Sequence, residues 1–311
     1  MFADAIEVVG GYTRPLFTIM KAYGGTEVIP AAGTLFFVND KGAAVTSRHV
    51  AIMLKNAEEI NRRYREFKQE KADLLAGGRD PSLIAELEVK YQYKAETIVQ
   101  IRNTFVDCVD KFTGFRIHLH PKADLAIICF DGYGELRYKG HAVFKRDGKE
   151  VRQGDSLCRL GFAFPEFTNY TYDPEKDILQ WTKGGKMNSP RFPMDGMVTR
   201  FLADKDGLNG IELSTPGLLG QSGGPLFDAM GVVCGMQSST KHMYLGFDVI
   251  DKEMTIRGKK QLVTDYAFLH LGQCVHVDLI KSFLREHDVP FSEEPARFGI
   301  DATKGGARPL S

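Results

Sequence analysis

The chain is divided into many short apolar or alternating runs, and this feature limits the fold more than any other. The runs have the length of strands, and turn residues such as Gly, Asn and Asp separate them. We expect strands at residues 16–22, 34–38, 43–46, 115–120, 125–130, 156–162, 197–201, 210–213 and 232–237. We expect a long aromatic-rich loop at residues 163–195 and a closing helix at residues 277–286. Many short strands with turn punctuation favour an all-β barrel or sandwich.

A densely charged segment interrupts this strand pattern. Residues 55–96 hold nine basic and nine acidic side chains in 42 positions, and apolar residues recur there at helical spacing. A Gly-Gly-Arg-Asp-Pro turn at residues 77–81 divides the segment in two. We therefore expect an inserted antiparallel helical hairpin at about residues 52–105, with its charged faces in solvent. Its mixed charge is a poor footprint for nucleic acid and suits the docking of a regulatory protein.

The overall charge excludes several classes of protein. Lys plus Arg and Asp plus Glu each number 40, so the formal net charge is zero. Dedicated binders of nucleic acid or of anionic membranes depend on a basic surface, so neither partner is expected. The first residues carry acid where a signal peptide needs Lys or Arg, and the apolar run at residues 125–130 is far too short to span a bilayer. We therefore expect a soluble, cytoplasmic protein.

Neither the cysteines nor the histidines indicate a metal site or a disulfide framework. The five cysteines are scattered and contain no Cys-x-x-Cys pair. His118 and His120 share one strand face and form a possible metal pair, but no third ligand is evident. We expect no metal and no cofactor. The cysteines are Cys108, Cys129, Cys158, Cys234 and Cys274.

Three short segments supply the residue types of nucleophilic catalysis. They contain His49, Asp124 and Ser222, in that order along the chain. A serine hydroxyl is a poor nucleophile at neutral pH, so it needs a base within hydrogen-bond reach and an acid that orients the base. The order His, Asp, Ser is one of the known solutions for such a triad. The trio predicts a serine nucleophile with His49 as its base.

The glycines around the serine have a separate chemical reason. A tetrahedral intermediate carries negative charge on the former carbonyl oxygen, and two backbone N–H groups can stabilise it. Gly220 and Ser222 are placed to provide these two donors. Glycine permits the backbone angles that such a turn needs. The sequence thus predicts an oxyanion hole at these two residues.

The motifs resemble those of the trypsin/chymotrypsin superfamily of serine endopeptidases, and within it the HtrA-like bacterial branch. The motifs are Thr-x-x-His-Val at residues 46–50, Asp-Leu-Ala at residues 124–126 and Gly-x-Ser-Gly-Gly-Pro at residues 220–225. Residues 151–162, 225–238 and 274–284 resemble the opening strand, the hairpin after the nucleophile and the closing strand and helix of the second barrel in that branch. The resemblance covers about two-thirds of the chain.

The resemblance implies two antiparallel six-stranded β-barrels with a cleft between them. The expected domains are residues 1–145, an N-terminal barrel that carries the helical hairpin, and residues 146–288, a C-terminal barrel with its closing helix. Residues 289–311 are rich in Pro, Gly and charge and are expected to be extended or disordered.

The resemblance also implies the roles of the site residues. His49 acts as general base and then acid, Asp124 holds its tautomer, and Ser222 attacks the carbonyl. Ser238 matches the position whose backbone pairs with the bound peptide and whose hydroxyl reaches the triad Asp. The substrate-binding residues implied in this way are Pro216, Gln237, Ser238 and Ser239.

Three departures from the family pattern narrow the expected function. Gln221 stands where activatable zymogens carry an Asp, so cleavage of a propeptide is not expected to switch the enzyme on. Pro216, beside Thr215, stands where trypsin has the acid that binds Lys or Arg, so a small or medium apolar residue is expected before the scissile bond. Without a PDZ-like domain or a secretion signal, the periplasmic quality-control role of HtrA proteins is not expected.

Two alternatives stay open beside a serine endopeptidase that a partner or a conformational gate regulates. One is a catalytically inactive trypsin-like scaffold that binds protein partners. The other is an α/β-hydrolase-type esterase, because the Gly-x-Ser-x-Gly pattern at residues 220–224 also fits its nucleophile turn. That turn leads from a strand straight into a helix, which Gly223, Gly224 and Pro225 disfavour here.

Overall fold

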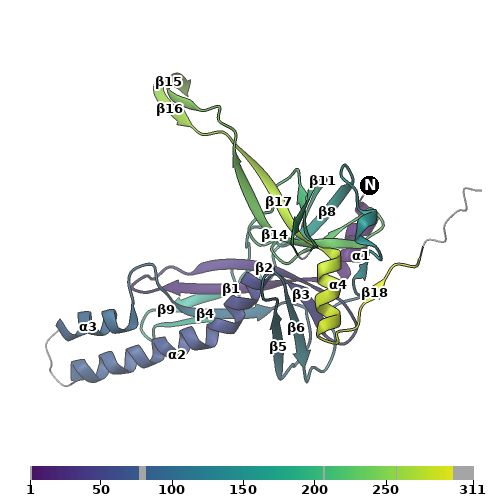
Figure 1. Ribbon diagram of the computed structural model, residues 1–311. Coiled ribbons are helices and arrows are strands. Elements are labelled where there is room, and N and C mark those ends of the chain that lie inside the picture. Colours follow the sequence, from purple (N-terminus) through teal and green to yellow (C-terminus); the bar gives the residue numbers. More distant parts are fainter. Residues whose placement is uncertain (1, 77–81, 206, 257, 297–311) are drawn as a thin grey trace, which may run out of the picture.

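The computed structural model describes residues 2–76, 82–205, 207–256 and 258–296. Two β-sheets of mainly antiparallel strands follow one another along the chain and share a large apolar core (Figure 1). This confirms the prediction of a mainly β chain with an inserted helical hairpin. Among the described helices, none is long and apolar enough to cross a membrane.

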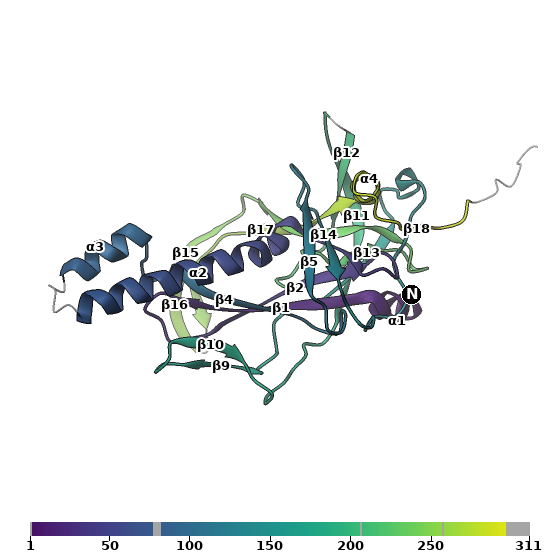
Figure 2. The same cartoon turned by 90° about the horizontal axis from the view of Figure 1, so that it is seen from below.

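The first sheet has six antiparallel strands in the order β4-β1-β2-β3-β6-β5. They are β1 (Thr13–Ala22), β2 (Ile29–Phe37), β3 (Ala43–Thr46), β4 (Ile98–Phe105), β5 (Gly114–Leu119) and β6 (Ala126–Asp131). All four residues of β3 are buried, which explains its continuous apolar and β-branched sequence. The sheet is curled, and in the described residues its end strands β4 and β5 do not pair, so it forms an open half-barrel (Figure 2).

The second sheet closes into a barrel. Its strands follow the order β13-β8-β11-β12-β17-β14, and β13 pairs again with β14. They are β8 (Ser156–Gly161), β11 (Phe192–Asp204), β12 (Gly207–Leu213), β13 (Pro225–Phe227), β14 (Val233–Tyr244) and β17 (Phe268–His276). Two short strands, β7 (Val143–Phe144) and β18 (Ser292–Glu293), extend the sheet in parallel beside β14. A short 3₁₀ turn at Gly148–Glu150 follows β7.

One buried cluster joins the two sheets. It includes Phe36 of β2, Phe144 of β7, Phe227 of β13 and Phe283 of α4 (Val277–Glu286), all fully or nearly fully buried. The ring centroids of Phe36 and Phe144 lie 6.3 Å apart. Because the sheets share this core, side chains at their junction are held in fixed relative positions.

The helical hairpin consists of α2 (Arg48–Ala76) and α3 (Ser82–Tyr91) and projects from the first sheet (Figure 1). Its outer end encloses a small core of Tyr64, Phe67, Leu87 and Tyr91. Nearer the sheet, the Asn61 side chain accepts from the backbone N–H of Ile101 at 2.9 Å and donates to its carbonyl at 2.7 Å. Asn61 thereby provides hydrogen-bond partners for the backbone N–H and C=O of Ile101 at the outer edge of β4, and it anchors the helix to the sheet.

The predicted domains and segments relate to these elements as follows. The segment predicted as an insertion, residues 52–105, contains most of α2, all of α3 and also β4, which is a strand of the first sheet. The predicted tail, residues 289–311, contains β18, and its residues 297–311 lie outside the described residues. The turn predicted at residues 77–81 lies outside them as well.

Two segments differ from the strands, turns and loop expected from the sequence. Residues 3–12 form a helix, α1 (Ala3–Tyr12), because Ala5, Val9 and Tyr12 recur on one face and are buried in the main core. Residues 163–195 are not one loop: they contain a hairpin of β9 (Tyr170–Asp173) and β10 (Ile178–Trp181), and β11 begins at Phe192. The aromatic side chains of this segment pack on the outer face of β1, where Phe17 stacks on Phe167 at 4.2 Å.

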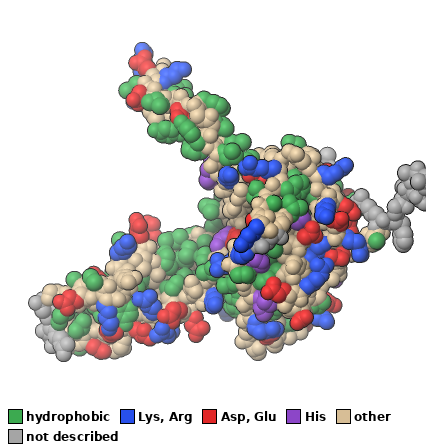
Figure 3. Space-filling view, viewed as in Figure 1, with side chains coloured by type: hydrophobic (Ala, Val, Ile, Leu, Met, Phe, Trp, Pro, Cys, Tyr) green, Lys and Arg blue, Asp and Glu red, His purple; other side chains and the backbone are tan. Residues whose placement is uncertain are grey.

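A long β-arm extends from the second barrel. Strands β14 and β17 continue past the barrel and carry a hairpin of β15 (Val249–Ile256) and β16 (Lys259–Asp265) (Figure 1). Hydrophobic side chains are exposed along it (Figure 3). They are Tyr244, Leu245, Phe247, Ile250, Met254, Leu262, Tyr266, Phe268 and Leu269. The sequence analysis did not identify this arm, because a two-stranded ribbon in solvent lacks a single buried face.

The N-terminus of α4 supplies a prediction about pH. His276 is fully buried, and its Nδ1 accepts a hydrogen bond from the backbone N–H of Asp278 at 3.3 Å. Burial lowers the pKa of His276, which also faces the Asp278 carboxylate and the buried Lys281. Below a pH of about 6.5 the unfolded chain therefore binds a proton that the folded chain resists, and stability should fall by up to about 1.4 kcal/mol per pH unit.

Denaturant unfolding at pH 7.5 and 5.5 tests this prediction. The His276→Asn variant keeps a side-chain acceptor at the helix cap but does not titrate. It should lose less stability between the two pH values than the wild type, while the contribution of the other histidines is common to both proteins. An equal loss in the two proteins would contradict the prediction.

Candidate active site

Strand pairing brings His49 and Asp124 together, although 75 positions separate them. His49 lies in the first turn of α2, just after β3, and Asp124 lies just before β6. These strands pair antiparallel, with Thr46 opposite Ala126. Residues just past the end of β3 are therefore neighbours of residues just before β6.

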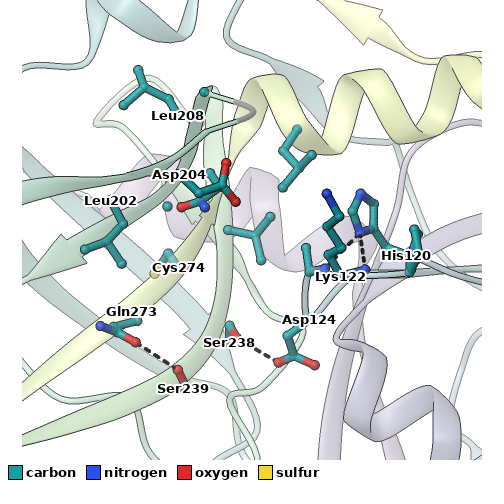
Figure 4. Close-up of a pocket in the computed structure, with 17 residues that line it drawn as sticks. His120, Lys122, Asp124, Leu202, Asp204, Leu208, Ser238, Ser239, Gln273 and Cys274 are labelled. Atoms are coloured by element: carbon teal, nitrogen blue, oxygen red, sulfur yellow. Dashed lines mark hydrogen bonds between the residues drawn. The ribbon is translucent and has the colours of Figure 1, made fainter.

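The Asp124 carboxylate accepts hydrogen bonds from three groups. The imidazole Nδ1 of His49 lies 2.9 Å from Oδ2 and 3.1 Å from Oδ1, and the backbone N–H of His49 donates to Oδ1 at 2.9 Å. The hydroxyl of Ser238 donates to Oδ2 at 2.7 Å, as Figure 4 shows. With Nδ1 donating to the carboxylate, the neutral imidazole presents Nε2 as an acceptor.

These hydrogen bonds decide the ionisation state of Asp124. Burial alone would raise the pKa of its carboxyl, but the bonds from the His49 imidazole, the Ser238 hydroxyl and the His49 backbone more than offset burial. The pKa of Asp124 is therefore held below its ordinary value. The group is a carboxylate at neutral pH and can stabilise a positive charge on His49.

His120 shapes the turn that presents Asp124. Its Nδ1 accepts from the backbone N–H groups of Ala123 at 2.8 Å and Lys122 at 3.2 Å. The neighbouring His118 packs against His287, with tilted rings whose centroids lie 4.2 Å apart. Each histidine of the pair considered as metal ligands thus has a protein partner.

Ser222 lies in a turn that only glycine can build on either side. Gly220 and Gly223 have φ angles of +93° and +87°. A Cβ on Gly220 would lie 2.2 Å from the carbonyl oxygen of Phe162, and one on Gly223 would lie 2.1 Å from that of Thr34. Such contacts exclude a side chain at both positions.

Two hydrogen bonds of the buried Gln221 side chain hold this turn in place. Gln221 is fully buried, accepts from the backbone N–H of Leu218 at 3.0 Å and donates to the carbonyl of Phe192 at 3.0 Å. The backbone N–H of Thr34 in the first sheet donates to the carbonyl of Ser222 at 2.9 Å. The nucleophile turn is therefore held by both sheets.

The two predicted oxyanion donors are free. Within the described part of the chain, the backbone N–H groups of Gly220 and Ser222 have no hydrogen-bond acceptor. Free donors in a rigid turn can stabilise an oxyanion, because they need no reorganisation when charge develops.

The predicted substrate-binding residues line the same cavity as His49 and Ser222. The cavity has a volume of about 510 Å³. Its lining includes Pro216, Gln237, Ser238 and Ser239, which the sequence predicted, and Thr240, His242 and His270, which it did not. The Ser222 hydroxyl donates to the carbonyl of Ser238 at 3.3 Å in this conformation, rather than to His49.

A second cavity, of about 460 Å³, is lined in part by Asp124 and is drawn in Figure 4. It shares Ser238 and Ser239 with the first cavity, and its lining contains Asp124 but neither His49 nor Ser222. Because it lacks both the base and the nucleophile candidate, we place the reacting groups in the first cavity.

Sequence reasoning missed Arg159, which lies directly behind the first cavity. Its guanidinium donates to the Gln237 side chain at 2.8 Å and to the Thr215 carbonyl at 3.1 Å. Arg159 is fully buried. The signal was present in the sequence: a lone Arg in the otherwise apolar run of β8 predicts a buried cation that needs acceptors.

A comparison with protein families agrees with the motifs. A family model described as trypsin-like peptidase domain matches residues 33–236. Among solved structures, a variant of the HtrA-type protease AlgW with a tripeptide is 14% identical, with a TM-score of 0.43, and the match covers 93% of this chain and 64% of that one. AlgW with a decapeptide is 13% identical, with a TM-score of 0.44, covering 92% and 67%. No curated protein sequence matches the chain.

Proposed function

Because this chain belongs to the trypsin-like peptidase family, we propose that it is a serine endopeptidase that cleaves proteins through an acyl-enzyme. The observation that carries the proposal is the Asp124 carboxylate, which accepts from both His49 and Ser238 while His49 shares a cavity with Ser222. A half-buried, ionised acid that fixes a histidine beside a serine is the arrangement that activates a hydroxyl nucleophile.

In the proposed first step, Ser222 attacks the substrate carbonyl while His49 takes its proton. The Ser222 hydroxyl must turn away from the Ser238 carbonyl, to which it now donates, and toward Nε2 of His49. Asp124 stays ionised and stabilises the imidazolium that forms. His49 then gives the proton to the leaving amine, and water hydrolyses the acyl-enzyme by the same route in reverse.

The oxyanion of each tetrahedral intermediate is proposed to bind the backbone N–H groups of Gly220 and Ser222. Each donor of this kind typically contributes about 10²–10³ in rate. The substrate is proposed to lie extended beside residues 238–240, which line the cavity, and to pair with their backbone as an added strand.

Regulation by a protein that docks on the helical hairpin is part of the proposal. Helix α2 begins at Arg48 and continues without a break through His49 into the projecting hairpin. A partner bound at its outer end would therefore act on an element that contains the base. This regulation stays a prediction.

The alternatives differ in their support. Strand β13 (Pro225–Phe227) follows the Ser222 turn, so nothing favours an α/β-hydrolase, in which a helix follows the nucleophile. An inactive trypsin-like scaffold would keep the same fold, so only an experiment distinguishes it from an active endopeptidase.

Labelling of the full chain with a fluorophosphonate tests the proposal. Wild-type protein should label, and Ser222→Ala should not, because the probe reacts with an activated serine. Ser156→Ala, which changes an exposed serine at the start of β8, is the matched control and should label like wild type. Labelling that persists in Ser222→Ala would overturn the assignment, and a folded wild type that never labels would favour the inactive scaffold.

A further inference from the structure

The floor of the cavity beside Ser222 is built by Gln237, and Arg159 lies behind it. Gln237 is 2% exposed, and Arg159 is 0% exposed. The guanidinium lies so close to the barrel wall that a Cβ on Gly272 would be 2.2 Å from its Nη1. Glycine at position 272 therefore leaves room for the guanidinium, which any larger residue would displace.

The charge of Arg159 has no ionic partner. Its guanidinium donates to Gln237 and to Thr215, both neutral, and in the described residues it forms no ion pair. Its Nε atom is buried without a hydrogen bond. A buried cation usually pairs with a carboxylate, because desolvation without one costs several kcal/mol. The charge of Asp195 acts on Arg159 from a distance, and this carboxylate is exposed.

Arg159 also determines which end of the Gln237 amide faces the cavity. A guanidinium has only donors, so it is met by the amide oxygen Oε1. The amide nitrogen Nε2 then points to the other side, where it donates to the Ser239 carbonyl at 2.9 Å and lies 2.1 Å from where a Cβ on Gly217 would be. Gly217 and Ser239 both line the cavity. The floor therefore presents an N–H donor with a positive charge behind it.

The cavity walls carry polar groups beside apolar side chains. Thr240 donates its hydroxyl to the carbonyl of Gly217 at 2.8 Å and so joins two lining segments. His242 and His270 line the cavity as well, with their Nδ1 atoms 2.6 Å apart. None of the described lining residues is Asp or Glu.

We infer that this cavity binds an acidic side chain, Glu or Asp, as the residue before the scissile bond, with Gln237 as the contacting donor and Arg159 as its positioning residue. The inference rests on the proposed endopeptidase function and deepens it. It differs from the small or medium apolar residue expected from Pro216. That expectation rested on the absence of an acid at position 216, whereas this inference rests on the buried cation of Arg159 behind the cavity floor. An acidic group there would lie opposite the buried positive charge of Arg159.

Matched peptides that differ only at this residue test the inference. The full chain is assayed with Glu, Asp, Gln, Ala, Leu and Lys before the scissile bond. Wild type should have a kcat/KM on the order of tenfold higher for Glu than for Gln, because a hydrogen bond to a charged group is about twice as strong as one to a neutral group. The difference should appear mainly in KM.

Two variants separate positioning from folding. Arg159→Met should remove the preference for Glu over Gln, and Gln237→Glu, whose new carboxylate pairs with Arg159, should reverse it. Fluorophosphonate labelling of each variant shows whether its active site still folds, because neither change alters a triad residue. Arg152→Met, at an exposed arginine of the same barrel, is the control and should keep the wild-type preference. If Arg159→Met does not fold, Gln237→Glu still decides.

The possible outcomes are distinguishable. A labelled wild type that prefers Ala or Leu overturns the inference and leaves the proposed function standing. A preference for Glu that survives in both variants overturns the assignment to Arg159 and Gln237. A folded wild type that never labels overturns the proposed function, and this inference with it.

Discussion

Replacing His49 with alanine should lower kcat by about 10⁶-fold, the largest effect that we expect from one substitution. Without the imidazole, Ser222 loses the base that accepts its proton during attack and that returns a proton to the leaving amine. Only the oxyanion donors and substrate binding would remain, and they account for a small part of the rate. KM should change little, because His49 contacts the reacting atoms rather than the rest of the substrate.

Single-turnover cleavage of the best peptide substrate measures this loss. The His49 side chain is 52% exposed, so the variant should unfold at nearly the wild-type temperature. His141→Ala is the matched control, because His141 contacts Ser292 on the far strand β18 and should leave kcat close to wild type. A loss in kcat smaller than about a hundredfold would be too small for a general base and would contradict the assignment.

The predicted site was accessible from the sequence because its residues stand in short local patterns. The turn at Ser222 needs glycine on both sides for backbone reasons, since a Cβ on Gly220 or Gly223 would meet a carbonyl oxygen. The strand patterns before His49 and after Asp124 are equally local, and the structure pairs these two strands as β3 and β6. The mainly β fold and the helical hairpin could be predicted for the same reason.

Features that depend on contacts between distant segments could not be predicted in this way. Helix α1 contains Gly10 and Gly11, which disfavour a helix, and it is stabilised by burial of Val9 in the core that joins the two sheets. The pattern of β8 indicates that Arg159 is buried, but its partner Gln237 lies on β14, 78 positions later, and could not be identified from that pattern. The aromatic segment at residues 163–195 packs on β1, a strand near the start of the chain. The sequence pattern of the segment alone could not identify β1 as its packing partner.

The Asp124→Asn variant should lower kcat by about 10⁴-fold while leaving Ser222 and His49 in place. Three donors converge on the carboxylate, namely the backbone N–H of His49, its imidazole Nδ1–H and the Ser238 hydroxyl. An amide offers one oxygen, so its NH₂ group must face at least one of these donors. Where it faces the ring, Nδ1 becomes the acceptor and the proton moves to Nε2, so His49 can no longer accept from Ser222.

The comparison with Asp131→Asn isolates this effect. Asp131 ends the same strand, β6, and forms an exposed ion pair with Arg116 at 3.0 Å, so its loss should leave kcat close to wild type. Asp124→Asn should show its loss in kcat rather than in KM, because Asp124 does not contact the substrate. Its fluorophosphonate labelling should slow in proportion, since attack on the probe uses the same base. A labelling rate equal to that of wild type would mean that Asp124 does not set the tautomer of His49.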